Sequence, residues 1–148
     1  MEITPARYWE RAEEACSKAS INLTSKRRLV LLYLFTTHKA LSPYEIADKI
    51  VQDYQKTISP MSIYRLLNFL ERNRLVRKLR SMNKYIMSDY DFSENAGDIS
   101  QFLICSQCSA VKEIRVKPEA IDLLRSKIAD SGFQLKTPEM EIECLCST

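Results

Sequence analysis

The chain has 148 residues, of which 22 are basic and 19 acidic, and its formal net charge is +3. With 45% hydrophobic and 28% charged residues it has the composition of a globular protein rather than a disordered tail. Its longest apolar run, Leu29–Phe35, is too short to span a membrane, and the N-terminus has no secretory signal pattern. We therefore expect a cytoplasmic protein of one domain or two small ones.

The small net charge conceals a difference between two parts of the chain. Residues 1–88 contain 16 Lys/Arg and 8 Asp/Glu, a net charge of +8, whereas residues 89–148 contain 6 and 11, a net charge of −5. This asymmetry indicates that the first part meets a polyanion and the second does not. The alternative is that two solvated surfaces merely differ in charge.

Four helices are predicted in the basic part. The first covers residues 5–19, and the second runs from the N-cap Thr24 to about Phe35. The third begins at Ser42, which forms a capping box with Glu45.

The fourth helix begins at Ser59-Pro60 and is followed by a hairpin. Residues Ile63, Leu66, Leu67 and Leu70 form one buried stripe, and the residues off that stripe are Tyr64, Arg65, Asn68 and Arg72. Residues 75–79 and 84–87 are predicted as the two strands of a β-hairpin. Helix, turn, helix and basic hairpin together predict a winged helix-turn-helix domain over residues 1–88.

The acidic part is predicted to contain a hinge and a small α/β domain, so the chain as a whole is α+β. Residues 89–100 form the hinge, and residues 101–148 the domain. That domain has strands at 101–104 and 110–116, a helix from Pro118 to Ser131 ended by Gly132, and a last strand at about 133–144. Because so few residues make a marginal core, a metal ion and dimerisation would both stabilise it.

Two cysteine pairs carry the strongest chemical signal. Cys105 and Cys108 are separated by two residues, and Cys144 and Cys146 by one. Four thiolates satisfy the tetrahedral preference of zinc and leave no open position, so we predict one structural zinc per subunit. The alternatives are a reversible thiol redox sensor and cysteines without metal. The fifth cysteine, Cys16, is expected to pack inside the domain.

The fourth helix and the hairpin are predicted to contact double-stranded DNA. Arg65 is suited to donate two hydrogen bonds to guanine, and Tyr64 to contact a thymine methyl group or a phosphate. The basic residues expected at the flanking phosphates are Arg77, Lys78, Arg80 and Lys84. The alternative is a protein-interaction module whose winged helix reads no DNA.

Enzymatic chemistry has no support in the sequence. The chain contains two glycines and one histidine, His38, which is predicted to lie in a surface loop. The sequence has no phosphate-binding glycine loop, and a single histidine argues against a histidine-based catalytic site, so we expect no enzyme, no small-molecule substrate and no membrane partner.

Several motifs together resemble the ferric uptake regulator (Fur) family, and most of all its zinc uptake regulators. They are Thr24-x-x-Arg27, Ser42-Pro-Tyr44, Pro60-x-Ser62-Ile63-Tyr64-Arg65-x-Leu67-x-x-Leu70, and Phe102-x-x-Cys105-x-x-Cys108 with Val111-Lys112-Glu113. The resemblance covers roughly residues 10–146. It implies a homodimeric repressor with a winged-helix domain, a hinge, a dimerisation domain, a structural four-cysteine zinc and a separate regulatory metal site at the hinge.

The resemblance also assigns residues by position. Tyr44 and Arg65 match DNA-contacting residues, and Arg27, Ser62 and Tyr64 match positions on the same DNA-facing side. The four paired cysteines match the structural zinc ligands, with the last pair one residue closer.

The regulatory metal site does not carry over. Where the zinc regulators have His, Cys, His and Glu, this chain has Arg77, Ser88, Asp98 and Glu113. We therefore expect a dimeric regulator of a pseudo-palindromic operator that does not depend on a regulatory metal. A site for Mn²⁺ or Mg²⁺ made of the hinge carboxylates is the alternative.

Overall fold

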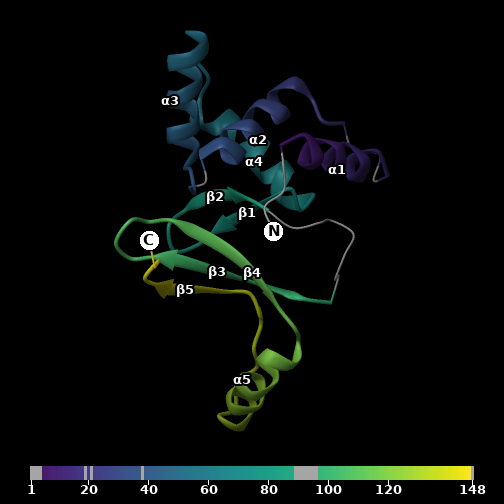
Figure 1. Cartoon of the computed structure of the whole chain (residues 1–148), viewed down its shortest axis with the longest axis vertical. Helices are drawn as coiled ribbons and strands as arrows, with labels where there is room; N and C mark the ends of the chain where they lie inside the picture. Colours follow the sequence, from purple (N-terminus) through teal and green to yellow (C-terminus); the bar gives the residue numbers. More distant parts are fainter. Residues whose placement is uncertain (1–4, 19, 21, 38, 89–96, 148) are drawn as a thin grey trace. The chain divides into compact units, whose positions relative to one another are not determined.

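The computed structural model describes residues 5–18, 20, 22–37, 39–88 and 97–147 (Figure 1). The chain divides into two compact units, residues 1–92 and residues 93–148. His38 and residues 89–96 of the predicted hinge lie outside the described residues. Within the described part, no helix has the length and apolar character needed to cross a membrane.

The first unit contains four helices followed by a two-stranded hairpin. The elements are α1 (Pro5–Lys18), α2 (Ser25–Thr37), α3 (Pro43–Tyr54), α4 (Pro60–Arg72), β1 (Val76–Leu79) and β2 (Lys84–Met87). Strands β1 and β2 are antiparallel, with Leu79 opposite Lys84. Leu41 adds an isolated antiparallel bridge to Tyr85. This is the predicted winged helix-turn-helix order.

The predicted caps begin the two helices of the helix-turn-helix. The Ser42 hydroxyl accepts the backbone N–H of Glu45 at 3.1 Å, and the Glu45 carboxylate accepts the backbone N–H of Ser42 at the same distance. In α4, the Ser59 hydroxyl accepts the backbone N–H of Ser62 at 3.2 Å. A proline follows each cap, where its fixed φ favours the first helical turn.

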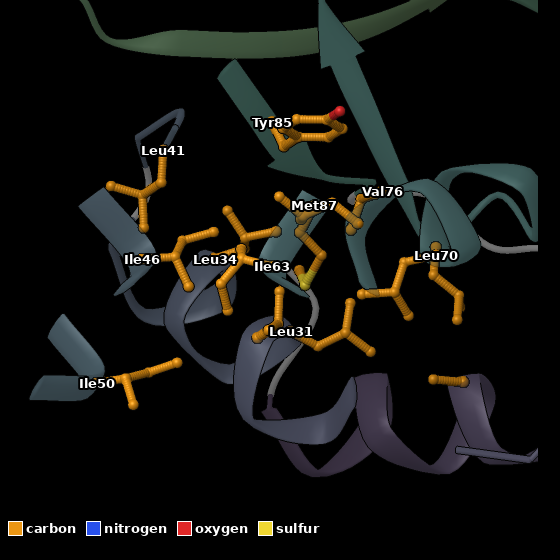
Figure 2. Packing of buried hydrophobic residues seen from close by; sticks show 14 of the residues in the cluster. Leu31, Leu34, Leu41, Ile46, Ile50, Ile63, Leu70, Val76, Tyr85 and Met87 are labelled. Atoms are coloured by element: carbon orange, nitrogen blue, oxygen red, sulfur yellow. The ribbon is translucent and has the colours of Figure 1, made fainter. Parts of the chain in front are cut away.

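The core of the first unit forms around the buried face of α4. Ile63, Leu67 and Leu70 are fully buried, as are Val30 and Leu31 of α2. Figure 2 shows Leu31, Ile63 and Leu70 within one cluster that also includes Met87 of β2. The cluster extends to α1, where Cys16 is buried as predicted. Helix packing therefore fixes the rotation of α4 about its axis.

The second unit is a three-stranded sheet with one helix. Its elements are β3 (Ile99–Cys105), β4 (Val111–Val116), α5 (Glu119–Asp130) and β5 (Met140–Cys144). The strand order is β4-β3-β5, in which β3 pairs antiparallel with β4 and parallel with β5. Mixed helix and sheet confirm the α+β class.

Two strands begin more than one residue away from the predicted position. The last strand covers residues 140–144 rather than 133–144, since the segment before it contains Pro138, which cannot donate to a strand ladder. Strand β3 begins at Ile99, inside the predicted hinge, because Ile99 and Ser100 pair with Val116 and Arg115.

Gly132 ends α5 as predicted. Its φ is +86°, and its N–H donates to the carbonyl of Ala129 at 3.0 Å. The N–H of Phe133 donates to the carbonyl of Ile128 at 3.2 Å, which completes a Schellman motif.

We expect Leu67→Ala to lower the free energy of unfolding of the first unit by about 2–5 kcal/mol, because it leaves a cavity beneath α4. Urea unfolding followed by the fluorescence of Trp9, the single tryptophan, measures this change in the unit concerned. Met61→Ala is the matched control, since Met61 lies on the same helix and is 61% exposed. Equal decreases in the free energy of unfolding for the two variants would contradict the packing of α4.

Candidate nucleic-acid interface and metal centre

The face of α4 opposite the core presents a line of exposed side chains. Met61, Arg65, Asn68 and Arg72 are all exposed, at spacings of four, three and four residues. This periodicity places them on one side of the helix, facing away from Ile63, Leu67 and Leu70. We call these four residues the outer stripe. Arg65, predicted to contact a base, therefore lies where a groove of DNA could be reached.

The hairpin contacts α4 at two points. The Asn83 amide donates to the Tyr64 hydroxyl at 3.2 Å, and the Tyr85 hydroxyl donates to the Asn68 amide oxygen at 3.3 Å. Burial raises the pKa of Tyr85, which keeps its hydroxyl protonated as a donor. Tyr64 is half-buried, so its hydroxyl is oriented by the hairpin as well as by α4.

The other predicted contact residues of the helices differ in their surroundings. Tyr44, near the start of α3, is 63% exposed. The Ser62 hydroxyl lies 2.9 Å from that of Ser59, within the cap of α4. The Arg27 guanidinium lies 3.4 Å from the centre of the Phe69 ring and donates to the carbonyl of Asn22. Arg27 thus packs α2 against α4 through a cation–π contact.

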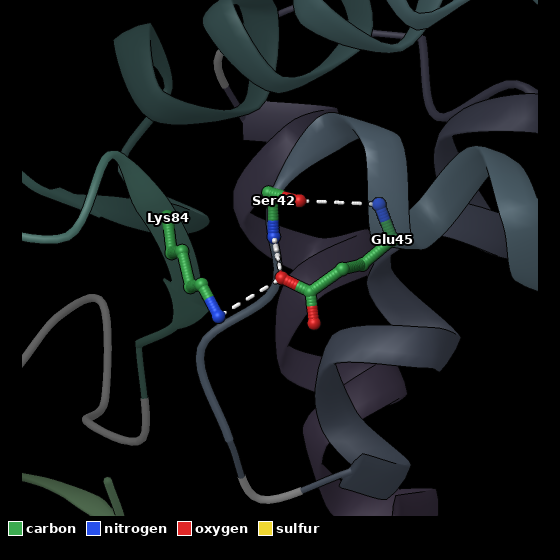
Figure 3. Close-up of polar contacts among 3 residues, drawn as sticks. All are labelled: Ser42, Glu45 and Lys84. Atoms are coloured by element: carbon green, nitrogen blue, oxygen red, sulfur yellow. Dashed lines mark hydrogen bonds and ion pairs between the residues drawn. The ribbon is translucent and has the colours of Figure 1, made fainter.

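Three of the basic hairpin residues differ in what their side chains contact. Arg80 is exposed in the turn, and the Lys78 ammonium lies 5.8 Å from the centre of the Tyr85 ring. The Lys84 ammonium lies 3.0 Å from the Glu45 carboxylate (Figure 3). The sequence predicted Glu45 as a cap but not this ion pair, because no local spacing relates residues so far apart in the chain.

Hydrogen bonds to Glu45 affect its titration. Burial alone raises the pKa of Glu45, but hydrogen bonds from Lys84 and from the backbone and side chain of Ser42 outweigh it and hold that pKa below its ordinary value. The carboxylate therefore stays charged in the neutral range, and the ion pair persists there.

In the second unit, three of the predicted metal ligands form a cluster. The thiol sulfurs of Cys105, Cys108 and Cys146 lie within 4.8 Å of one another, and those of Cys108 and Cys146 are 3.6 Å apart. With Zn–S bonds of about 2.3 Å, tetrahedral geometry requires S···S separations of about 3.8 Å. The cluster therefore fits a zinc ion. Cys144 does not belong to it, and its role as fourth ligand stays a prediction.

Local backbone geometry brings these thiols together. Ser109, with φ of +63°, donates to the carbonyl of Cys105 and closes the turn between β3 and β4. The parallel pairing of β3 with β5 sets Cys105 beside Cys144, so the chain reaches Cys146 next to this turn. Hydrogen bonds from the backbone N–H groups of Cys146, Cys108 and Gln107 lower the pKa of the Cys105 thiol to about 6. Lowering this pKa favours the thiolate, the form that binds a metal.

The four positions that match the family's regulatory metal site, and at which we expect no such site here, are divided between the units. In the first unit, Arg77 lies on β1 opposite Ile86, and Ser88 is buried. In the second unit, the carboxylate of Asp98 lies 3.2 Å from the Lys117 ammonium.

Glu113, the one family-type ligand among these positions, is buried on β4. The Ser100 hydroxyl donates to its carboxylate at 2.7 Å. This hydrogen bond supplies the polar partner that a buried carboxylate requires.

Comparisons with known proteins agree on one family. The model of the "Ferric uptake regulator family" matches residues 18–143. The chain is 29% identical over 136 residues to the zinc uptake regulation protein of Escherichia coli strain K12, covering 92% of this chain and 77% of that protein.

Solved structures of two zinc regulators are also similar. A zinc uptake regulator complexed with zinc and DNA has a TM-score of 0.79 at 27% identity, covering 99% of this chain and 95% of that one. The holo form of XcZur has a TM-score of 0.74 at 29% identity, covering 93% of each chain.

We expect the purified chain to hold about one zinc per subunit and to retain it against a mild chelator, because several thiolates bind the ion together. Replacing Cys105, Cys108 or Cys146 with Ser should release the zinc, whereas Cys16→Ala, in the core of the first unit, should retain it. Metal analysis after dialysis measures the content. Equal release from Cys144→Ser would place its thiolate at the fourth position.

The competing interpretation gives a different result in the same experiment. Protein that is free of zinc and forms a reversible disulfide would contradict the structural zinc site and favour a thiol redox sensor.

Proposed function

The chain belongs to the ferric uptake regulator family of transcription regulators, and from this we propose that it is a dimeric, sequence-specific DNA-binding repressor that reads its operator with α4 and needs no regulatory metal. Its family consists of regulators rather than enzymes. As a DNA-binding protein it would act in the cytoplasm.

The outer stripe of α4 carries this proposal. A helix that follows a helix-turn-helix turn enters the major groove with its exposed side chains toward the bases. Arg65 occupies the middle of the stripe, and its planar guanidinium can donate two hydrogen bonds to guanine O6 and N7. The similar zinc uptake regulator complexed with DNA supports the same use of the fold here.

Exposed apolar side chains in the second unit support the dimer. Leu123 is 72% exposed, Phe133 is 75% exposed and Leu145 is 66% exposed. Burial of such side chains against a second copy would remove apolar surface from water and stabilise a dimer. Two copies of α4 related by a two-fold axis would read two half-sites of a pseudo-palindromic operator.

The donor set at the regulatory positions does not fit a zinc sensor. Arg77 carries a permanent positive charge and has no lone pair for a metal, and Ser88 is a neutral hydroxyl in place of a thiolate. The carboxylates of Asp98 and Glu113 already interact with Lys117 and Ser100. We therefore propose that DNA binding does not require a second metal ion.

The operator is unidentified, so the probe for the following experiments is a duplex that the wild-type chain selects from a random-sequence pool. A scrambled duplex of the same composition serves as non-specific DNA. If the selection enriches no sequence, the proposed function fails.

We expect Arg65→Ala to weaken binding to the selected duplex by about 1–3 kcal/mol and to relax base preference at one position in each half-site, because two base hydrogen bonds are lost. Fluorescence anisotropy titrations measure both effects. Arg125→Ala, which removes an exposed arginine from α5, should bind as the wild type does. Unchanged affinity and preference in Arg65→Ala would contradict the assignment of α4 as the reading helix.

We also expect affinity for the selected duplex to be unchanged by a chelator that removes loosely held metal while the cysteine-bound zinc remains. Zinc content and anisotropy are measured on the same sample, so that loss of the structural ion is recognised. If affinity falls and added zinc, iron or manganese restores it, the chain has a regulatory metal site after all.

A further inference from the structure

We propose that Glu45 and Lys84 form a clamp between the hairpin and α3, so that Lys84 positions the DNA-reading surface instead of contacting a phosphate. This inference rests on the proposed DNA-binding function and changes the role expected for Lys84. Figure 3 shows Lys84 reaching from β2 to the capping box of α3.

The carboxylate of Glu45 is held in place before Lys84 reaches it. One oxygen, Oε1, accepts both the Ser42 backbone N–H at 3.1 Å and the Lys84 ammonium at 3.0 Å. Exposed ion pairs contribute little partly because two long side chains must be ordered. Here the capping box has already ordered one of them, and the two side chains are only 32% and 44% exposed.

The ion pair is one of several contacts that residues 83–85 make with neighbouring parts of the first unit, and we call this set of contacts the seam. Leu41 and Tyr85 exchange two backbone hydrogen bonds, at 2.9 and 2.8 Å, next to Ser42 and Lys84 respectively. On the other side of Lys84, Asn83 donates to the Tyr64 hydroxyl of α4. Residues 83–85 therefore contact both helices of the helix-turn-helix, and a shift of the hairpin would move the groups that orient Tyr64 and Asn68.

The ion pair also makes Lys84 a poor phosphate ligand. A phosphate that approached the ammonium would bring a second anion close to the Glu45 carboxylate. The positive charge of Lys84 is thus largely offset inside the protein, and its contribution to counterion release on DNA binding is small.

Two substitutions separate the clamp from a phosphate contact. Glu45→Gln removes the charge but keeps a side-chain acceptor for the Ser42 N–H, since glutamine also completes a capping box. Lys84→Met keeps the length of the stem without the ammonium. Lys84→Arg retains a cation, and Lys56→Met, in the exposed turn before α4, controls for the loss of one positive charge.

The clamp predicts matched, non-additive effects on DNA binding. Glu45→Gln and Lys84→Met should each weaken binding to the selected duplex about twofold to fivefold, in line with one partly shielded pair. The double variant should be no weaker than either single variant, because both remove the same interaction. Lys84→Arg should restore most of the affinity. The dependence of the affinity of Lys84→Met on salt concentration should match that of the wild type.

A phosphate contact predicts the opposite pattern and would overturn the inference. Lys84→Met would then reduce the salt dependence by about one counterion and weaken selected and scrambled duplexes alike. Glu45→Gln would strengthen binding, because it frees the ammonium.

Hydrogen exchange without DNA keeps this inference distinguishable from the proposed function. The amides of Leu41 and Tyr85 should exchange faster in both single variants than in the wild type or in Lys56→Met, since the seam opens more often. Unchanged exchange would overturn the clamp whatever the protein binds. A wild-type chain that binds no duplex, with faster exchange in the variants, would overturn the proposed function and leave the clamp as a structural contact.

Discussion

Burial of one face of α4 is the constraint on which the rest of the first unit depends. Ile63, Leu67 and Leu70 are each fully buried, and each such side chain contributes about 1.5–3 kcal/mol relative to an exposed one. A rotation of α4 would expose them, so the helix has one stable orientation. That orientation directs Arg65 outward, and function thus follows from packing on the opposite side.

Local patterns in the sequence predicted the helices and where they begin, but they did not predict polar contacts between residues far apart in the chain. Ser42 with Glu45 and Ser59 with Pro60 are signals within one helical turn, and both proved to be caps. The Lys84–Glu45 pair depends on where the hairpin packs, whereas the expected phosphate contact of Lys84 was based on its charge and its place on the predicted hairpin. The shortened last strand has a similar cause, because parallel pairing with β3 begins only at Met140.

The second unit compensates for a small apolar core with polar contacts. Its buried residues, among those that the structure describes, include the polar Ser100, Gln101 and Glu113 as well as the apolar Phe102 and Ile121. The Gln101 amide donates to the carbonyl of Pro138 at 2.9 Å and accepts the N–H of Met140 at 3.2 Å, so one side chain attaches the segment that leads into β5. A zinc ion at the thiol cluster would join the C-terminal end of β3 to the residues that follow β5.

The charge difference between the two parts of the chain does not measure how many phosphates the protein can neutralise. Among the described residues of the first unit, glutamates pair with several basic groups: Lys18 with Glu14, Arg28 with Glu13, and Lys84 with Glu45. The dependence of DNA affinity on salt concentration is set by the charges that a phosphate can approach, rather than by the net charge. A basic group that is held in such an ion pair adds little to the affinity for DNA of any sequence, and in the Lys84–Glu45 pair it positions the surface from which α4 contacts the bases. Specificity is the difference between the affinity for the operator and the affinity for other sequences, so an ion pair that neutralises Lys84 and positions α4 increases the share of the binding energy that depends on sequence.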